Sequence, residues 1–504
     1  MSRAVSVALV VNVLTAWFNG GYLHPDEHWQ IIEFAWYKLG HQPASGLPWE
    51  FAAHARAGFQ PWLAAGLVAL MQKAGVFSPF AAAFVLRLAS ALLGLWVSLR
   101  LCAWILPTIR RLDYRRLAFY GTLFLWVTPF LHARFSSESW GASLTFLGLT
   151  LLLDADAAAA RQKEPGASMP VRAAVLAACA GLAWGFACFC RVQMAPAIVG
   201  AGLWFLAFRR GSWRTLAVVA AAFVVGSAAN VAIDRWLYDA WVLTPIRNFD
   251  VNVIQGRAAQ LGVSPWWMIL APLLLLALPP FNVLALVPLL VGAWTGRRHV
   301  LAWVILPFVI SHAAVAHKEL RFMAPMLSPI LLALAVSLDI LPTRLAAWLD
   351  APRLAAVRAV SVWTVAISNT VALVLVTFIA ASPTFPLFEK VAEIGRSHPT
   401  RLLVVPVSPA QHDLDTWQRM AFYRPDSVSA GVVPDGPDLV RAAGAPPGTS
   451  VLVLQFGSKP PASLAAAGLR CVPRAVSFAR LLDQADRFGF VRDKPVWTLW
   501  EVGR

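Results

Sequence analysis

Charged residues are scarce in this chain of 504 residues. Only 13% of the residues are Asp, Glu, Lys or Arg, whereas 59% are hydrophobic. A soluble domain of this length needs a larger share of charged residues on its surface, so the composition excludes one soluble domain. Runs of about 20 apolar residues cross a bilayer as helices. The sequence therefore predicts a polytopic α-helical membrane protein.

Cysteines and acidic residues are also few. Cys102, Cys179, Cys188 and Cys190 lie within apolar runs and Cys471 stands alone, so neither a disulfide framework nor a zinc site is indicated. The 26 acidic residues face 42 basic ones, a formal net charge of +16. The basic residues gather in short clusters between apolar runs. Membrane topology explains that pattern better than binding to nucleic acid, and no nucleic-acid partner is predicted.

About eleven apolar runs are predicted to span the membrane. They lie near residues 4–18, 80–106, 116–133, 138–153, 172–190, 193–208, 214–233, 265–293, 299–316, 322–340 and 358–381. The run at 265–293 contains Pro279 and Pro280, and could instead be a broken helix or two shorter pieces. Every second connection, counted from the N-terminus, is rich in arginine. This pattern predicts a cytoplasmic N-terminus and leaves the residues after the last span outside.

The predicted domains are a transmembrane domain at residues 1–381 and an extracytoplasmic soluble α/β domain at residues 382–504. In the first domain, the outer segment 20–79 contains two runs, 27–39 and 62–71, that are typical of helices lying along the membrane interface, with packing on the bundle as the alternative. In the run 27–39, Glu33, Tyr37 and Lys38 are predicted on the polar face of such a surface helix. The second domain alternates short β-rich and helical runs, at 402–407, 410–421, 451–455, 464–468 and 496–501.

The polar segments predicted on the outer face carry the chemically unusual residues. They are HPDEHWQ (24–30), HARFSSES (132–139), CRVQ (190–193), DRWLYDAW…RNFDVN (234–252) and HKELRF (317–322). A random scatter over the inter-span connections would rarely place all five on one face. Ionisable groups are costly at mid-bilayer, so we expect the functional site at the outer membrane surface.

The first of these segments places Asp26 and Glu27 side by side, between His24 and His28. Pro25 suits the first position of a helix, and the helix dipole favours carboxylates in the first turn. The start of a helix therefore explains these residues as well as a functional role does. A helix start can also aim a carboxylate into a pocket, where it acts as a general base. Of the pair we choose Asp26, because adjacent helix positions point about 100° apart and Pro25 fixes the turn just before it.

Three motifs in this order, HPDEHWQ, DRWLYDAWVLTPIRNFDVN and HKELRF, resemble those of the GPI-anchor and N-glycan mannosyltransferases that use dolichyl-phosphate-mannose. These enzymes belong to the GT-C superfamily of polytopic glycosyltransferases, and the resemblance runs from residue 24 to about residue 330. It implies a GT-C fold and an inverting enzyme that moves a sugar, here mannose, from a polyprenyl-phosphate donor. The implied partners are that lipid-linked donor, a glycan or glycolipid acceptor and membrane lipid.

The resemblance also assigns roles to residues. Asp26 and Glu27 become the catalytic carboxylates. The late basic motif supplies His317, Lys318 and Arg321 for the donor phosphate, although snorkelling at a span end is the alternative for the lysine and the arginine. Arg191, on the same face, offers a further cation for the phosphate. The residues predicted to contact acceptor or sugar are His24, Gln30, Arg134, Glu138, Gln193 and Asn248. No metal and no cofactor besides the donor substrate is predicted.

Arginine outnumbers lysine 35 to 7 and no N-x-S/T site occurs, which favours a bacterial inner membrane with the site facing the periplasm. In a eukaryote the same topology would face the ER lumen. Two other classes stay open. A transporter or flippase of a lipid-linked saccharide would carry its site at the bilayer midplane, often in two related halves. A transferase of another lipid-linked group, such as phosphoethanolamine, would need a metal-binding cluster in its soluble domain, and residues 382–504 contain none at metal-ligand spacing.

Overall fold

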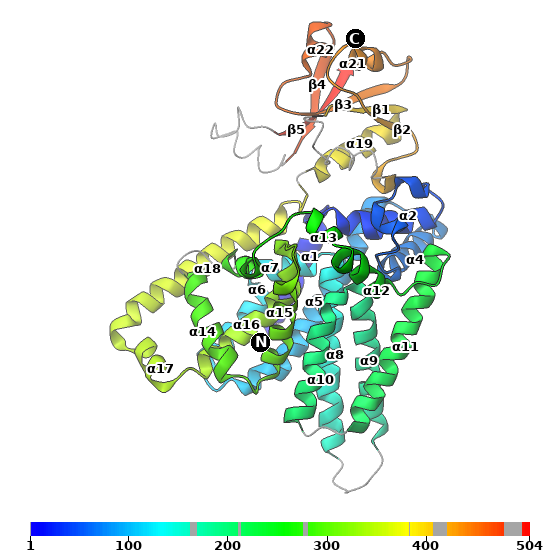
Figure 1. Ribbon diagram of the computed structural model, residues 1–504. Helices are drawn as coiled ribbons and strands as arrows, with labels where there is room; N and C mark the ends of the chain where they lie inside the picture. The colour runs from blue at the N-terminus through cyan, green and yellow to red at the C-terminus, as the bar shows by residue number, and fades with distance from the viewer. Residues whose placement is uncertain are drawn as a thin grey trace. The chain divides into compact units, whose positions relative to one another are not determined.

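The computed structural model describes residues 2–161, 169–209, 213–275, 281–382, 384–406, 421–477 and 496–503 (Figure 1). The chain divides into two compact units, each considered by itself. Unit 1 comprises residues 1–16, 49–63 and 86–377, and unit 2 comprises residues 17–48, 64–85 and 378–504. The C-terminal residues thus share a unit with two earlier segments. The predicted domains at 1–381 and 382–504 stay a proposal.

Unit 1 is helical. The helices that lie at least partly in it are α1 (Ser2–Phe18), α3 (Trp49–Ala52), α4 (Phe59–Lys73), α5 (Pro79–Ile105), α6 (Leu112–Phe124), α7 (Val127–His132), α8 (Ser137–Ala160), α9 (Val171–Cys190), α10 (Ala195–Phe208), α11 (Trp213–Tyr238), α12 (Thr244–Phe249), α13 (Arg257–Gln260), α14 (Phe281–Thr295), α15 (Val300–Ala314), α16 (Ala324–Asp339), α17 (Thr343–Asp350) and α18 (Ala355–Phe378). Short 3₁₀ or π turns join them at η3 (Leu106–Thr108), η4 (Val192–Met194), η5 (Asp250–Ile254), η6 (Trp266–Leu275), η7 (Leu320–Met323) and η8 (Pro352–Leu354).

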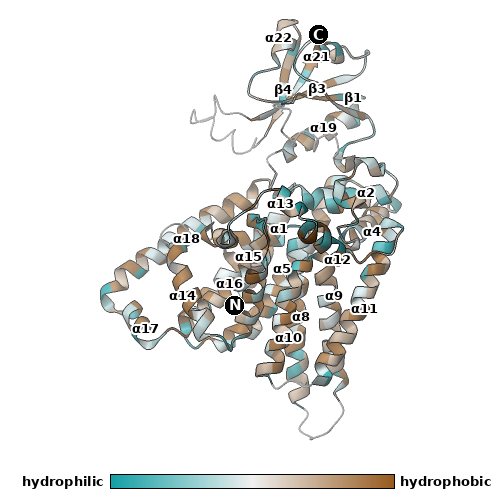
Figure 2. Ribbon diagram, in the orientation of Figure 1, coloured by the Kyte–Doolittle hydropathy of each residue, from teal (hydrophilic) through white to brown (hydrophobic). Residues whose placement is uncertain are grey.

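Six of the described helical segments are long and apolar enough to cross a membrane, namely Pro79–Thr108, Ser137–Ala160, Val171–Cys190, Trp213–Tyr238, Leu320–Asp339 and Pro352–Phe378. Shorter apolar helices occur at Ser2–Phe18, Val192–Phe208, Ala285–Thr295 and Val300–Ala314. Apolar residues dominate these helices (Figure 2). The polytopic helical class is confirmed, whereas the count of eleven spans stays a prediction. Within the run at 265–293 the structure describes η6 and α14, and residues 276–280 with Pro279 and Pro280 lie outside the described residues.

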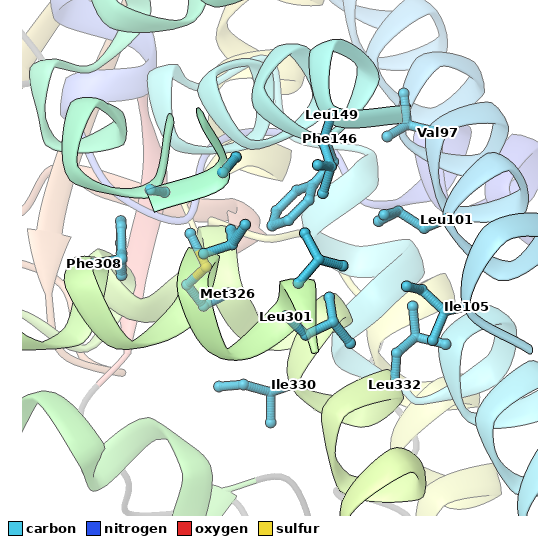
Figure 3. Close-up of a cluster of buried hydrophobic side chains, with 14 of the residues drawn as sticks. Val97, Leu101, Ile105, Phe146, Leu149, Leu301, Phe308, Met326, Ile330 and Leu332 are labelled. Atoms are coloured by element: carbon cyan, nitrogen blue, oxygen red, sulfur yellow. The ribbon is translucent and has the colours of Figure 1, made fainter. Parts of the chain in front are cut away.

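Close helix packing builds the core of unit 1 around leucine, isoleucine and phenylalanine side chains (Figure 3). Between α8 and α9, Trp184 lies over Gly148 and donates its indole N–H to the carbonyl of Thr145 at 2.9 Å. Gly181 faces the backbone of α11, where an added Cβ would lie 2.1 Å from the carbonyl oxygen of Val219. Small residues let helices approach where lipid supplies no hydrophobic driving force between them.

The predicted span 116–133 is wrong as one helix, because the chain breaks at Leu125 into α6 and α7. Pro129 has no amide to bond the Leu125 carbonyl, and its ring crowds that carbonyl. Asn369 of α18 compensates: its side chain donates to the carbonyl of Phe124 (2.8 Å) and accepts from the amide of Trp126 (2.9 Å). This explains a polar asparagine in the middle of an apolar helix.

Unit 2 contains a five-stranded mixed sheet in the order β2-β1-β3-β5-β4. The strands are β1 (Thr400–Val404), β2 (Val428–Val432), β3 (Ser450–Phe456), β4 (Arg470–Val476) and β5 (Trp497–Gly503). β1 runs parallel to β2 and β3, with Leu402 opposite Leu452, whereas β5 runs antiparallel to β3 and β4. The described helices that lie wholly in this unit are η1 (His28–Ile32), α2 (Glu33–Lys38), η2 (Ala44–Gly46), α19 (Phe385–Ser397), η9 (Ala421–Tyr423), α21 (Pro437–Ala443) and α22 (Ala462–Ala466).

The sheet has a small core made by Leu403, Val405, Val451, Val453 and Trp500 together with leucines of α21 and α22. The β-rich runs predicted at 402–407, 451–455 and 496–501 are confirmed as β1, β3 and β5. The sequence reading missed β2 and β4, whose exposed residues blur the apolar pattern. The helical run at 464–468 corresponds to α22, and the run at 410–421 lies outside the described residues except for Ala421.

Candidate active site

The predicted site residues fall into both units. Those of HARFSSES (132–139), CRVQ (190–193), the middle motif (234–252) and the basic motif HKELRF (317–322) lie in unit 1. Those of the acidic motif HPDEHWQ (24–30) lie in unit 2. Each group has its own internal geometry.

In unit 1 the central contact joins Arg191 and Glu138. Arg191 follows the last residue of α9, and its Nη1 donates to Glu138 Oε1 at 2.7 Å and to Ser137 Oγ at 3.3 Å. Ser136 starts α8 as its N-cap by accepting from the Ser139 amide at 3.2 Å. A serine cap followed by an acid in the first turn is a favourable helix start, so the local sequence aims Glu138 at Arg191. Both side chains are buried.

Arg321 of η7 extends this contact. Its Nη1 lies 3.6 Å from Glu138 Oε1, and its Nε donates to Glu319 Oε2 at 2.6 Å. Arg191, Glu138, Arg321 and Glu319 thus form a continuous set of ion pairs, called here the arginine–glutamate network. His317 lies at its end, with Nε2 3.3 Å from Glu319 Oε1 and Nδ1 3.0 Å from the carbonyl oxygen of Gly262.

Phe322 lies against both guanidinium groups of the network. The guanidinium carbon of Arg191 is 5.1 Å from the centre of its ring, and that of Arg321 is 5.7 Å away. Cations at such distances are attracted to the face of an aromatic ring. The aromatic residue of the HKELRF motif therefore holds the two arginines as a pair.

The network balances two guanidinium groups with two carboxylates, and Arg56 acts on Arg191 as a further positive charge. Burial lowers the pKa of the Arg191 guanidinium; Glu138 and Glu319 oppose this shift, and Arg321 and Arg56 add to it. The guanidinium group of Arg191 thus interacts electrostatically with those of Arg321 and Arg56 and with the carboxylates of Glu138 and Glu319. Arginine stays charged even so. One buried and two partly buried guanidinium groups of this kind are suited to an anionic ligand with several oxygens, because the guanidinium fork matches phosphate geometry.

Arg56 was missed by the sequence reading, and the middle motif explains its place. Tyr238 donates its hydroxyl to the carbonyl of Arg56 at 2.5 Å, and Asn248 donates its amide to the carbonyl of Ala55 at 2.9 Å. The amide of Gly58 donates to the buried carboxylate of Asp234 at 2.7 Å. The motif thus holds the loop that carries Arg56, and the predicted sugar contact of Asn248 stays a prediction.

The remaining predicted residues of unit 1 have varied surroundings. Lys318 is buried, and its Nζ donates to the carbonyls of Val315 (2.5 Å) and Ser264 (3.2 Å), so it is not a lysine snorkelling into water. Arg134 is buried with its guanidinium carbon 5.4 Å from the ring centre of Phe130. Gln193 lies in η4, two residues after Arg191.

In unit 2 the acidic motif forms a tight turn into a helix. The Asp26 amide donates to His24 Nδ1 at 3.2 Å, and that nitrogen lies 3.5 Å from Asp26 Oδ1. Glu27 Oε1 accepts from the backbone amide of Leu23 at 3.3 Å. The side chain of Asp26 is 26% exposed. Glu27 therefore closes the turn on which Asp26 is presented.

The chain after this turn is a π-helix, which sequence reasoning did not predict. π-helical turns are rare in proteins, and those that occur are often found at functional sites. Gln30 is buried within it. Glu33, predicted on the polar face of a surface helix, is instead buried at 2% exposure. A lone carboxylate among Ile31, Ile32, Phe34 and Ala35 was the signal that could have identified it.

Among the residues that the structure describes, no group of three or more His, Cys, Asp or Glu side chains is arranged to hold a metal ion. The geometry that is present offers the carboxylates of Asp26 and Glu27 in unit 2, and guanidinium groups paired with carboxylates in unit 1. Proton transfer and anion binding are the chemistry that these groups support.

Fold and charge pattern define a multi-pass α-helical membrane protein with a C-terminal sheet domain. The sequence model of the Alg9-like mannosyltransferase family matches residues 4–405, and the chain belongs to that family. It is 28% identical over 340 residues to GPI mannosyltransferase 4 of Eremothecium gossypii, covering 63% of this chain and 61% of that protein. It is 23% identical over 335 residues to GPI mannosyltransferase 3 of Drosophila melanogaster, covering 63% and 53%.

The chain thus spans between about half and two thirds of the length of these curated relatives. Among solved structures, ArnT from Cupriavidus metallidurans bound to undecaprenyl phosphate aligns with a TM-score of 0.49 at 17% identity, over 99% of this chain and 97% of that chain.

Proposed function

We propose that this protein is an inverting glycosyltransferase that moves mannose from a polyprenyl-phosphate donor to a hydroxyl group of a glycan or glycolipid. Membership of a mannosyltransferase family supports this activity. The observation that carries the proposal is the arginine–glutamate network, in which the buried pair Arg191–Glu138 is joined by Arg321 and Glu319.

The proposed reaction is a single displacement. The carboxylate of Asp26 takes the proton of the acceptor hydroxyl, and the oxygen lone pair forms a bond to the anomeric carbon. The bond between that carbon and the phosphate oxygen breaks, and its electrons stay on the phosphate. Attack from the opposite side inverts the anomeric centre. Glu27, which bonds the Leu23 amide, holds the turn and orients the acceptor together with His24 and Gln30.

The leaving group determines what the cations must do. A sugar phosphodiester carries one negative charge, whereas the released polyprenyl phosphate carries up to two. Arg191 and Arg321 are the groups we assign to this developing charge, because preorganised donors stabilise charge most where water is excluded. Glu138 and Glu319 keep the two guanidinium groups oriented. Lys318 adds positive charge nearby in sequence, and His317, whose ring bonds Glu319, is assigned to the donor phosphate as well. Arg134, Gln193 and Asn248 are the proposed sugar contacts of this unit.

We place the reaction at the extracytoplasmic membrane face, which is the periplasmic face in a bacterium. The distribution of arginine between the apolar helices supports this placement. A transporter is not favoured, because the family is one of mannosyltransferases and the charged clusters lie at helix ends rather than within long apolar helices.

Transfer of label tests the proposal. Purified full-length protein in detergent receives radiolabelled polyprenyl-phosphate-mannose and, as acceptor, a lipid extract from cells that lack the gene. We expect label in acceptor glycolipids that are separated from the donor, and about a hundred- to ten-thousandfold less with the Asp26→Asn variant. Wild-type protein that releases no label from the donor would contradict the proposal. Mass spectrometry of the glycolipids lost on deletion of the gene would identify the acceptor.

A further inference from the structure

We propose that Glu33, His28 and Tyr423 are positioning residues that anchor the acidic motif to the C-terminal part of the chain. The inference rests on the proposed function, since it states what holds the catalytic turn in place. All the residues concerned lie in unit 2.

The first step is the burial of Glu33. Its Oε1 lies 2.7 Å from His28 Nε2 and accepts from the backbone amide of Phe422 at 3.1 Å. Its Oε2 accepts from the Gln42 side chain at 2.6 Å. A carboxylate removed from water is costly unless several donors compensate it, and here three donors converge on one group. One of the three belongs to η9, almost four hundred residues further along the chain.

The second step is the aromatic contact made by η9. The ring of Tyr423 stacks on the imidazole of His28, with centroids 5.1 Å apart and planes 18° apart. Phe422 meets Trp36 edge to face at 5.3 Å. Tyr423 also contacts Phe80 and Phe385, at 5.1 and 5.7 Å. The segment Ala421–Tyr423 is therefore packed on the acidic-motif helix through both its backbone and its rings.

The third step links this anchor to the reacting carboxylate. The amides of His28 and Trp29 both donate to the carbonyl of Pro25, at 3.0 and 2.9 Å. Pro25 immediately precedes Asp26, so a fixed His28 fixes the turn that presents Asp26. Small displacements of a catalytic group can cost about a hundredfold in rate. The sequence predicted residues 382–504 as a separate soluble domain without a part in the reaction. The contacts of Phe422 and Tyr423 with Glu33 and His28 give this segment a role in positioning Asp26.

The test combines turnover with backbone exchange in the full-length protein. The variants are Glu33→Gln, which removes the charge, and Tyr423→Leu, which removes the stacked ring from the other side of the contact. Tyr423→Phe keeps the ring and serves as the conservative variant. Glu393→Gln, in an exposed pair with Lys390 on α19, is the matched control. For each, kcat, the KM for polyprenyl-phosphate-mannose and hydrogen exchange of residues 20–36 are measured.

We expect Glu33→Gln and Tyr423→Leu to lower kcat by about 10- to 100-fold, with the donor KM little changed, and to speed exchange in residues 20–36 at least about tenfold. Tyr423→Phe and Glu393→Gln should match the wild type. A variant that loses only folded protein, with normal kcat per folded molecule, would overturn the inference. So would faster exchange without a loss of kcat. Should one variant not fold, the other tests the same contact from the opposite side.

Failure of the proposed function is distinguishable. If Asp26→Asn keeps full transfer, the assignment of the base is wrong whatever Glu33 does. Exchange of residues 20–36 then decides the anchor by itself, and a normal exchange rate in both Glu33→Gln and Tyr423→Leu would overturn it.

Discussion

His28 and Glu33 stand five residues apart, yet their side chains meet, with Nε2 and Oε1 2.7 Å from each other. In an α-helix, positions five apart point about 140° away from each other, since each residue turns about 100°. The chain at His28–Ile32 is a π-helix, whose hydrogen bonds join residues five apart. The wider turn therefore brings the imidazole and the carboxylate to the same side of the helix, where both are buried.

Replacing the proposed base is the first prediction. Asp26→Asn has nearly the same shape and should leave expression and donor binding intact, while transfer falls about a hundred- to ten-thousandfold because no group accepts the proton. Glu27→Gln should lower the transfer rate less than Asp26→Asn does, since the carboxylate of Glu27 bonds a backbone amide. Transfer of radiolabelled sugar from purified donor measures both. Near wild-type turnover in Asp26→Asn with loss in Glu27→Gln would reverse the assignment, and activity in both would make the motif structural.

The second prediction concerns the leaving phosphate. Arg321→Ala should weaken donor binding and slow transfer by about 1.5–3 kcal/mol, the size of a charge-assisted contact. Arg321→Lys should have a donor affinity and a transfer rate between those of the wild type and of Arg321→Ala. It keeps the positive charge but loses the guanidinium fork that bonds Glu319. Arg344→Ala, in α17, is the control and should behave as wild type. Unchanged donor affinity and rate in Arg321→Ala would leave this arginine outside the donor site.

The break between α6 and α7 leads to a third prediction. Asn369→Leu leaves the Phe124 carbonyl and the Trp126 amide without the two hydrogen bonds that Asn369 makes. The two bonds are partly buried, and losing such partners costs up to about 1–3 kcal/mol each, so the melting temperature in detergent should fall. Thr370→Val is the control, because Thr370 bonds only the Ala366 carbonyl of its own helix among the contacts described. Equal melting temperatures for the two variants would contradict the role of Asn369.

Helix packing provides the fourth prediction. In Gly181→Ala the new Cβ would lie 2.1 Å from the carbonyl oxygen of Val219, a backbone atom that cannot rotate away. The two helices must separate, at a cost of about 1–3 kcal/mol. Gly202→Ala, in α10, meets nothing within 4 Å and should stabilise the protein by up to about 1 kcal/mol. Thermal unfolding that ranks the two variants the other way would refute the packing argument.

The fifth prediction is the topology. A reporter enzyme that is active only on the outer side of the membrane should be active when fused after Arg504. The same reporter fused at Arg297–Arg298, in a predicted cytoplasmic loop, should be inactive. Activity of a cytoplasm-only reporter after Arg504 would place residues 382–504 inside, and the acidic motif would then lie on the other face as well.

Composition alone determines that this chain is a polytopic membrane protein, because a surface so poor in charge cannot face water on all sides. Local pattern also locates the apolar helices, three of the five strands and the motifs that the family shares. These features depend on neighbours a few residues apart, which the sequence displays directly. Pro129, which the sequence also displays, causes the break at Leu125, although the apolar run around it predicted one helix.

The tertiary structure decided which charged residues act together. Arg191 and Arg321 are 130 positions apart in the sequence, and only the packing of the helices brings both to Glu138. Glu33 had the pattern of a surface residue, and a backbone amide from Phe422 made it a buried anchor. Such contacts depend on long-range chain geometry, where burial strengthens every electrostatic interaction and penalises every unpaired charge. No local pattern in the sequence encodes that choice of partners.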